Sequence, residues 1–595
     1  MRVAVIGSGL AGLTTAYLLR EEGVEVFLIE KSDKVGFHSQ SVTVPLDRPP
    51  SQHEKSARQR SRSRSNKEEK RPDEQWVVDV PMRGFQGGYY PLLLALYRHL
   101  GIPLKTANYK FSFSSPSSTY FIHSGSSGYS TPSLPSRAWS TFFTLVGALA
   151  TFIGVAICYS MMVLLSLVAW HDLLPRCISR PSDLTLREFT STISSFLSYP
   201  LTIPIPFRPY PVWTPLGDMF DFFIAQIVLP LFSAVGTMTD ADVWSLPVRI
   251  VLEYIHLTLG TDHYHPAEGY SAADIAKKLV RPVLAQSEDH LKLSTEIIGL
   301  EYISAEEGIR LSMKTSSADA GGRNEEIMVD RVILATQASV AKRLLEGLED
   351  SLRGVGRDKE KRKISEMRAA LGKVRYRETI VVTHRDTSIL PSHKDRRDLN
   401  FLLPDDQMVL PASQASSATH RSPEYPVPYF MPVKDKAYTQ ATQIIYPPSR
   451  LKRKYGDELP VLQTTNPCVP IDPTKVLSIS RLERALPLKE PCKILPFLRN
   501  TSKSYSPPST IVHIVGSYAY PGIPLLEGCV GSAKMAAEIL LAELRPERSH
   551  PDGKPMDISE MRRVVGGVDW TTGKGGIWGR IWRWRLIDTP WGQFC

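Results

Sequence analysis

Cysteine is scarce in this sequence, and its spacing argues against two kinds of small scaffold. The 595 residues include six cysteines, which contain no C-x-x-C pair. Structural zinc sites and disulfide frameworks need closely spaced or regularly paired thiols. We therefore expect no metal site and no disulfide scaffold, and a reducing compartment fits this cysteine usage.

A signal for secretion is also lacking. Residues 1–7 form a short apolar run that is already interrupted by Gly7. A signal peptide needs an apolar stretch of about 7–15 residues behind a positively charged start. We expect the chain to stay inside the cell.

The charge excess of the chain is mostly local. Its formal net charge is +10, and Arg48 to Pro72 carry nine Lys or Arg against three Glu. This Ser-rich and Arg-rich stretch has too little apolar surface to order itself, so we expect a disordered surface loop. RNA binding through its Arg-Ser alternation is the alternative, but no RNA-recognition pattern surrounds it. We expect no nucleic-acid partner.

A glycine-rich turn follows the first apolar run. Val3–Ile6 have the β-branched character of a strand buried on both faces of a parallel sheet. The next six residues, Gly7-Ser8-Gly9-Leu10-Ala11-Gly12, match G-x-G-x-x-G. In this pattern the glycines allow a tight turn, backbone approach to a pyrophosphate and close helix packing. The spacing predicts a dinucleotide site.

An acidic residue stands where such a site needs one. Leu13–Glu22 have helical character, Gly23 stops the helix, and Val24–Ile29 form a second apolar strand that ends at Glu30. A carboxylate about 20 residues after the glycines accepts hydrogen bonds from a ribose diol and opposes a 2′-phosphate. The motif alone leaves FAD and NAD open.

The residues after Glu30 favour FAD. Lys31 to Ser39 resemble the "acid, small loop, G-G-R, Ser/Thr" segment of FAD-binding amine oxidases and carotenoid desaturases, with Phe37 and His38 where Gly and Arg are usual. The stretches 332–337, 514–517 and 525–533 resemble later motifs of the same superfamily. This resemblance implies FAD, bound by Gly7, Ser8, Gly9, Leu10, Ala11, Gly12, Glu30, Lys31, His38, Ser39, Ile297, Ala335, Thr336, Gly516, Glu527, Gly528 and Val530.

A narrower resemblance points to the substrate. The Tyr90-Pro91 segment, residues 384–387 and residues 464–467 resemble NAD/FAD-binding proteins found beside, or fused to, cyclopropane-fatty-acid synthase-like enzymes. The resemblance implies a small lipophilic substrate of fatty-acyl or isoprenoid-like type.

The expected fold class is α/β, with a Rossmann-like FAD-binding domain interleaved with an α+β substrate domain and an added apolar helical segment. The FAD-binding domain is expected to comprise residues 1–47, 77–100, 290–345 and 505–545, the disordered basic insertion 48–76, the substrate domain 101–289 and 346–504, and a Trp/Arg-rich tail 546–595. Within the substrate domain, 141–170 is the expected membrane-associated segment.

That apolar segment, Thr141–Trp170, contains no charged residue over 30 positions, more than a bilayer crossing needs. The glycine motifs on its two sides must meet at one FAD, so a single crossing would divide that domain. The candidate return helix, Met219–Val235, contains Asp221 and Pro230. We favour a re-entrant or monotopic anchor, with the FAD domain on the cytoplasmic side; a buried core helix is the alternative.

The expected function is FAD-dependent oxidation at a membrane, by hydride or electron transfer from a lipophilic substrate to the flavin. A flavin amine oxidase is the enzymatic alternative. Rab GDP-dissociation inhibitors and escort proteins share this fold without redox chemistry and give a non-catalytic alternative. No catalytic side chain is identified, although His263, His265 and His384 are candidates for proton transfer, and Tyr518 and Tyr520 for the flavin face. The oligomeric state stays open.

Deletion of residues 48–72 should leave the fold and the flavin content intact. Loop closure depends weakly on loop length, so the free energy of unfolding should change by no more than about 1 kcal/mol. Denaturant titration and flavin absorbance of the shortened chain check this. Loss of flavin would contradict the assignment of the stretch as an insertion.

Overall fold

The computed structural model describes 17 stretches of the chain. They are residues 1–37, 41–45, 76–80, 84–123, 133–171, 184–199, 201–205, 208–212, 215–268, 270–316, 323–404, 427, 437–449, 451, 460–499, 510–544 and 564–570. The basic stretch 48–72 and the Trp/Arg-rich residues 576–595 lie outside them.

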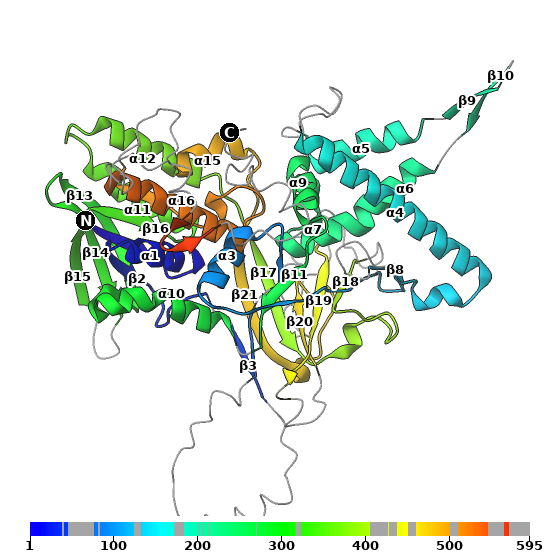
Figure 1. Ribbon diagram of the computed structural model, residues 1–595, viewed down its shortest axis with the longest axis horizontal. Helices are drawn as coiled ribbons and strands as arrows, with labels where there is room; N and C mark the ends of the chain where they lie inside the picture. The colour runs from blue at the N-terminus through cyan, green and yellow to red at the C-terminus, as the bar shows by residue number, and fades with distance from the viewer. Residues whose placement is uncertain are drawn as a thin grey trace, which may run out of the picture.

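A five-stranded parallel sheet forms the centre of the left half of Figure 1. Its order is β12 (Leu291–Lys292), β2 (Glu25–Ile29), β1 (Arg2–Ile6), β16 (Arg331–Leu334) and β22 (Val512–Ile514), and every neighbouring pair is parallel. The predicted α/β class with a Rossmann-like parallel sheet is confirmed.

Strand β1 is buried because each of its faces meets a different layer. Successive side chains of a strand point to opposite faces, so Val3 and Val5 belong to one apolar cluster and Ala4 and Ile6 to another. The first layer contains α1 (Leu10–Glu21), α3 (Pro91–His99), α10 (Ala272–Gln286) and α16 (Leu526–Leu544). The second contains α11 (Ala338–Ser351), α12 (Asp358–Leu371), α15 (Pro491–Arg499) and the antiparallel sheet β13 (Thr295–Ser304), β14 (Gly308–Thr315) and β15 (Arg323–Val329).

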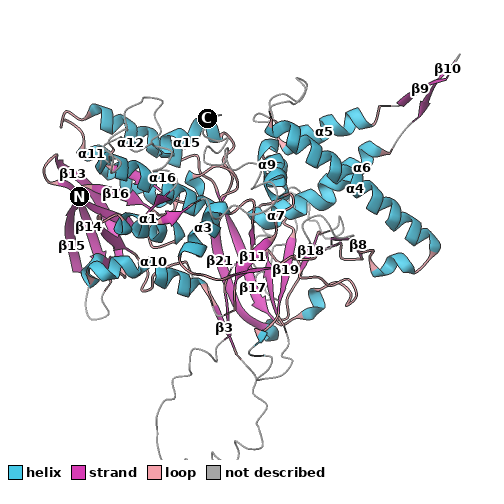
Figure 2. Cartoon of the chain, in the orientation of Figure 1, coloured by secondary structure: helices cyan, strands magenta, loops and turns pink. Residues whose placement is uncertain are grey.

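A seven-stranded mixed sheet organises the other half of the molecule (Figure 2). Its order is β21 (Val476–Ala485), β17 (Tyr376–His384), β20 (Val461–Thr465), β19 (Gln440–Ile445), β18 (Leu399–Leu402), β7 (Phe111–Ser114) and β8 (Thr119–His123). Smaller sheets pair β3 (Val42–Val44) with β4 (Trp76–Val78), β9 (Leu201–Ile205) with β10 (Arg208–Val212), β23 (Val564–Val565) with β24 (Val568–Asp569), and β11 (His263–Pro266) with both β5 (Phe85–Gln86) and β6 (Leu104–Thr106).

Helices cluster beside this second sheet at the right of Figure 1. They are α4 (Phe142–Trp170), α5 (Leu186–Leu197), α6 (Leu216–Phe223), the π-helical segment Ile224–Val228, α7 (Leu229–Gly236), α8 (Asp240–Trp244) and α9 (Val248–Thr258). Two helices are long and apolar enough to cross a membrane by length and composition: Phe142–Trp170 and Leu216–Gly236.

Two details differ from the sequence-based expectations. Helix α1 begins at Leu10 rather than Leu13, because Gly9 is its N-cap and Gly12 already lies in its first turn. Cys492 takes part in a disulfide bond, whereas Cys158, Cys468 and Cys529 are free thiols. Sequence spacing gives no sign of this bond, because thiols distant in sequence meet only through the tertiary fold.

Two of the segments that carry the narrower resemblance meet inside the seven-stranded sheet. His384 ends β17 and Thr464 lies on the paired strand β20, and the His384 Nε2 is 2.8 Å from the Thr464 hydroxyl. The other ring nitrogen accepts the N–H of Asp386 at 3.1 Å. This pairing gives the neutral ring with the proton on Nε2, and burial lowers the pKa of His384 to about 4.

In the His384→Asn variant, the free energy of unfolding should depend less on pH than it does in the parent. The unfolded chain binds a proton on His384 below about pH 6.5, and the folded chain only below about 4, so the free energy of unfolding falls as the pH falls between these values. The contribution is on the order of 3 kcal/mol. Urea titrations at pH 7 and pH 4.5 should show a smaller difference for the variant, while a matched His393→Asn change at an exposed position should match the parent. An unchanged difference in the His384 variant would contradict the neutral buried ring.

Candidate dinucleotide site

The predicted site residues gather where the strands of the parallel sheet end. Ile6, Ile29, Leu334 and Ile514 are the last residues of β1, β2, β16 and β22. Because these strands are parallel, the residues that follow them share one edge of the sheet. Ligands of open α/β sheets bind outside this carboxyl edge. The glycine turn, Glu30, Ala335, Thr336 and Gly516 all lie there.

The first and third glycines of the turn are required by packing. Gly7 has φ +102°, and a methyl group on it would lie 2.6 Å from the carbonyl oxygen of Ala335. A methyl group on Gly12 would overlap the carbonyl oxygen of Gly7. These two glycines therefore let β1, α1 and the end of β16 come together.

The second glycine has a different environment. Gly9 has φ −60° and ψ 173°, which other residues adopt readily. Among the described residues, nothing lies within 4 Å of a methyl group placed on it. No described side chain caps the N-terminus of α1 at this point. The positive end of the helix is therefore open to an anion, as a pyrophosphate requires.

Glu30 closes the other side of the turn. One carboxylate oxygen accepts the Ser8 N–H and the Ser8 hydroxyl, each at 2.7 Å, and the other accepts the Ser32 N–H at 2.9 Å. The Ser8 hydroxyl also accepts the Gly36 N–H at 3.0 Å. A carboxylate oxygen has two lone pairs, so the oxygen facing Ser32 keeps one for a ribose hydroxyl.

The remaining N-terminal predictions have mixed placements. Lys31 is exposed and pairs with Glu296 at 3.1 Å, while Leu10 and Ala11 are buried in the core. Ile297 lies on β13, in the antiparallel sheet, and is buried against the layer of α11. The carbonyl oxygen of Thr336 accepts the Tyr518 hydroxyl at 2.9 Å. His38 and Ser39 lie outside the described residues.

The closing segment is held by its own packing. The Gly516 N–H donates to the Ser532 hydroxyl at 2.9 Å, which ties the end of β22 to α16. A methyl group on Gly528 would lie 2.8 Å from the Ser517 carbonyl oxygen, and Val530 is fully buried. Because Gly528 has no side chain, α16 packs closely against residues 517–520. Contact of Gly528 and Val530 with a cofactor stays a prediction.

Glu527 occupies a position that the sequence did not suggest. Its carboxylate accepts the N–H groups of Leu92 and Leu93, both at 2.9 Å, at the start of α3. Burial raises the pKa of Glu527 to about 8, and the two N–H donors oppose that rise. The side chain therefore caps α3 from the far end of the sequence, which joins two parts of the nucleotide-binding half.

Two tyrosine side chains pack against each other close to the start of α3. Tyr89 and Tyr254 pack with ring centroids 4.8 Å apart, and the Tyr89 hydroxyl accepts the N–H of Ile523 at 2.8 Å. Nothing in the sequence, which has 23 tyrosines, marks Tyr254 as the partner of Tyr89. Tyr520, a candidate for the flavin face, packs against α16 at Gly531 and is partly buried.

The histidines proposed for proton transfer lie elsewhere. His263 packs edge-on against Tyr109 with ring centroids 5.6 Å apart, and burial lowers its pKa to about 4. The His265 Nδ1 is 2.6 Å from the carbonyl oxygen of Pro266. Among the described residues, no group of three or more His, Cys, Asp or Glu is placed to hold a metal.

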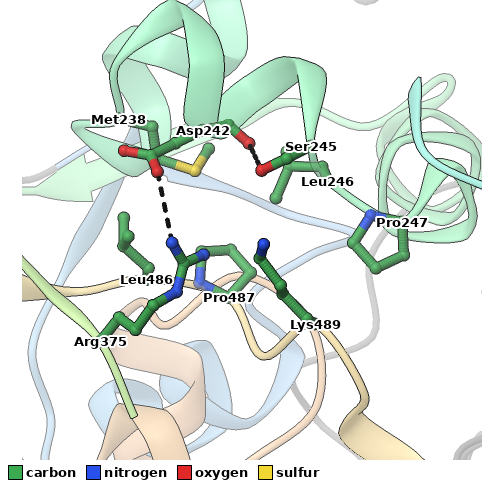
Figure 3. A pocket seen from close by; sticks show the side chains of 9 residues that line it. All are labelled: Met238, Asp242, Ser245, Leu246, Pro247, Arg375, Leu486, Pro487 and Lys489. Atoms are coloured by element: carbon green, nitrogen blue, oxygen red, sulfur yellow. Dashed lines mark hydrogen bonds and ion pairs between the residues drawn. The ribbon is translucent and has the colours of Figure 1, made fainter. Parts of the chain in front are cut away.

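A shallow depression with no room for a ligand lies where α8 meets the start of β17 and the end of β21, and Figure 3 shows its lining. Asp242 is the carboxylate in it, and Arg377 holds that carboxylate with bonds of 2.7 and 3.1 Å. Arg375 adds a contact at 3.7 Å. None of the residues predicted to bind a cofactor lines this depression. The charge pairing there joins the helical layer to the sheet.

Comparison with known proteins defines the class of the N-terminal part. A family model for NAD(P)-binding Rossmann-like domains matches residues 5–100, and no curated protein matches the chain. Among solved structures, cyclohexylamine oxidase from Brevibacterium oxydans IH-35A is 11% identical with a TM-score of 0.49, over 91% of this chain and 99% of that one. A wild-type putrescine oxidase bound to putrescine is 12% identical with a TM-score of 0.47, over 91% and 99% of the two chains.

The chain therefore contains a Rossmann-like dinucleotide-binding domain at its N-terminal end. At these identities and TM-scores we draw no function from the two oxidases. None of these matches bears on the association with cyclopropane-fatty-acid synthases, which stays a prediction.

Gly9→Val and Gly12→Ala should have opposite effects. The Gly9 variant has an allowed backbone and no described atom close to its Cβ, so its unfolding free energy without cofactor should fall by no more than about 1 kcal/mol, the cost of valine at a helix N-cap, while FAD binding is lost. The Gly12 variant forces α1 away from β1 and should lose about 1–3 kcal/mol or more. Thermal unfolding and flavin titration of both variants check this. Retention of FAD by the Gly9 variant would contradict the site.

Proposed function

We propose that this chain is an FAD-dependent oxidoreductase that oxidises a lipophilic substrate at a membrane. The observation that carries the proposal is the open helix N-terminus over Gly9, with the Glu30 carboxylate at the end of the adjacent strand. These are the two contacts that an adenine dinucleotide needs, for its pyrophosphate and its ribose. A Rossmann-like domain match over residues 5–100 supports the same class of ligand.

The residues present fit FAD at this edge of the sheet. The free N–H groups at the start of α1 would hold the pyrophosphate, and Glu30 would accept a ribose hydroxyl while opposing a 2′-phosphate. When bound, the flavin would supply the redox chemistry by accepting a hydride or electrons. The chain's own part is to bind and orient, and therefore no side-chain triad is required.

A membrane location follows from α4 under this proposal. Only 28% of its most apolar stretch is buried, against 56% for the second apolar helix, Leu216–Gly236. Apolar surface exposed on this scale in a folded protein usually marks a contact with a membrane or a partner. We propose that the flavin domain faces the cytoplasm and that a fatty-acyl or isoprenoid-like substrate enters from the lipid.

Purified protein should be yellow and should release FAD on denaturation. Glu30→Gln removes the charge that the ribose contact uses, so FAD affinity should fall about 10-fold to 100-fold. A Glu296→Gln change, at a carboxylate that pairs with Lys31 on the neighbouring sheet, should leave affinity unchanged. Flavin fluorescence titration of both variants measures the effect. Release of only FMN or NADP would contradict the proposal.

Anaerobic bleaching of the bound flavin identifies the substrate class. Under the proposal, fatty-acyl or isoprenoid lipids bleach the flavin and simple amines leave it oxidised. Bleaching by amines alone would make the chain a flavin amine oxidase. A colourless protein that binds lipid-modified partners would place it with the non-catalytic escort proteins.

A further inference from the structure

We infer that α4 lies in the plane of a membrane, with its outer face in one leaflet, and does not cross the bilayer. The inference rests on the proposed membrane location and specifies its geometry. Length and composition alone leave crossing open for this helix, so the decision comes from how α4 is attached to the rest of the protein.

One face of α4 is apolar and exposed along almost its whole length. The exposed large side chains recur at intervals of three or four residues, as expected for one side of a helix. They are Phe142, Phe143, Val146, Leu149, Ile153, Ile157 and Leu164. At 1.5 Å per residue, this stripe is about 33 Å long.

From Gly154 onward, the opposite face of α4 is packed on the protein. Gly154, Cys158, Met162 and Ser166 are buried at intervals of four residues. A methyl group on Gly154 would lie 2.6 Å from the Met219 sulfur, so α6 approaches the helix backbone there. Helix α9 contacts it as well, and Figure 1 shows α4 crossing this group of helices, with its N-terminal end extending past α6. Over this part of the helix, one side packs on the protein and the other side is uncovered.

Both ends of α4 are attached to the same body. Just before the helix, Ser136 donates to the Asp395 carboxylate through its N–H at 2.8 Å and its hydroxyl at 2.6 Å. At the other end, Trp170 stacks on His256 of α9 with ring centroids 4.3 Å apart. A helix that crosses a bilayer must carry its ends to opposite sides. Since one folded body holds both ends, α4 lies along its surface.

The uncovered face suits lipid better than a second protein. The exposed hydroxyl of Ser160, on this face, donates to the carbonyl oxygen of Ala156 within the helix at 2.8 Å. Protein interfaces carry about one hydrogen bond per 100–200 Å², and the only proton that the Ser160 hydroxyl can donate is already bonded within the helix. Acyl chains need no hydrogen bonds. Trp139, which is 69% exposed beside the start of the helix, is of a type enriched at membrane surfaces.

Charged substitutions on the uncovered face test the contact. Full-length Ile153→Glu/Ile157→Glu protein should lose binding to phosphatidylcholine vesicles by on the order of tenfold or more, measured by flotation in 1 M NaCl. The matched control is Ile298→Glu, because Ile298 on β13 and Ile153 are both 55% exposed. The control should float like the parent. If the double variant floats with vesicles as well as the parent does, the inference is overturned. It is also overturned if the parent is a dimer that does not bind vesicles and that dissociates when both residues are substituted.

Depth measurements separate lying from crossing. Nitroxide labels on Phe143→Cys, Ile153→Cys and Leu164→Cys, with the labelled parent chain as background, should report depths in the vesicle within about 5 Å of one another. A crossing helix would place the first and last labels about 31 Å apart along its axis. Such a gradient would overturn the inference.

Flavin content of the same samples keeps this test separate from the proposed function. The double variant should bind as much FAD as the parent, because α4 belongs to the half of the molecule built on the seven-stranded sheet. Vesicle binding by a protein without flavin would leave the in-plane helix standing and contradict the oxidoreductase. A protein that contains flavin but does not bind vesicles would leave the oxidoreductase standing and contradict the in-plane helix.

Discussion

The close approach of the first turn to the end of β16 is the constraint on which the rest of the nucleotide-binding half depends. Gly7 and Gly12 allow it, because a side chain on either would collide with backbone. The Ala335 N–H donates to the Ile6 carbonyl oxygen at 2.9 Å at the same place. With β1, α1 and β16 fixed in this way, the start of α1 points out of the carboxyl edge, and Gly9 is left with free space above it. Within this short motif, Gly7 and Gly12 therefore allow close packing, whereas Gly9 leaves space for a ligand.

Local sequence was enough to predict this turn, and the reason is physical. A tight turn, a helix start and an acid at the end of the next strand all lie within the first thirty residues, so each is set by neighbours in the chain. Glu527 shows where such reasoning stops. Its position at the glycine-rich start of α16 suggests a ligand contact, which stays a prediction, but no local pattern shows that its carboxylate caps α3, more than 400 residues earlier in the sequence. The hydrogen bond from His384 to Thr464 is equally invisible to a pattern along the chain.

The apolar run of α4 was also visible in the sequence, but its orientation was not. Composition shows that the segment is uncharged, but it does not show which side of the helix packs on the rest of the protein. That information lies in partners from distant segments: Asp395 at one end, His256 at the other and Met219 in the middle. Hydropathy therefore identifies the segment, and tertiary contacts decide whether such a helix crosses a membrane or rests on it.

The order of strands in the parallel sheet has a consequence for synthesis of the protein. Its strands come from the beginning, the middle and a late part of the described chain, and β22 is the last of them to be made. The ribosome adds about 5–20 residues per second, so α4 emerges on the order of tens of seconds before the sheet is completed. Helices α6 and α9, which pack on its inner side, are complete by residue 258, but its outer apolar side has no partner in the described chain throughout that interval. The nascent chain should therefore engage a chaperone or the membrane surface before it acquires a cofactor.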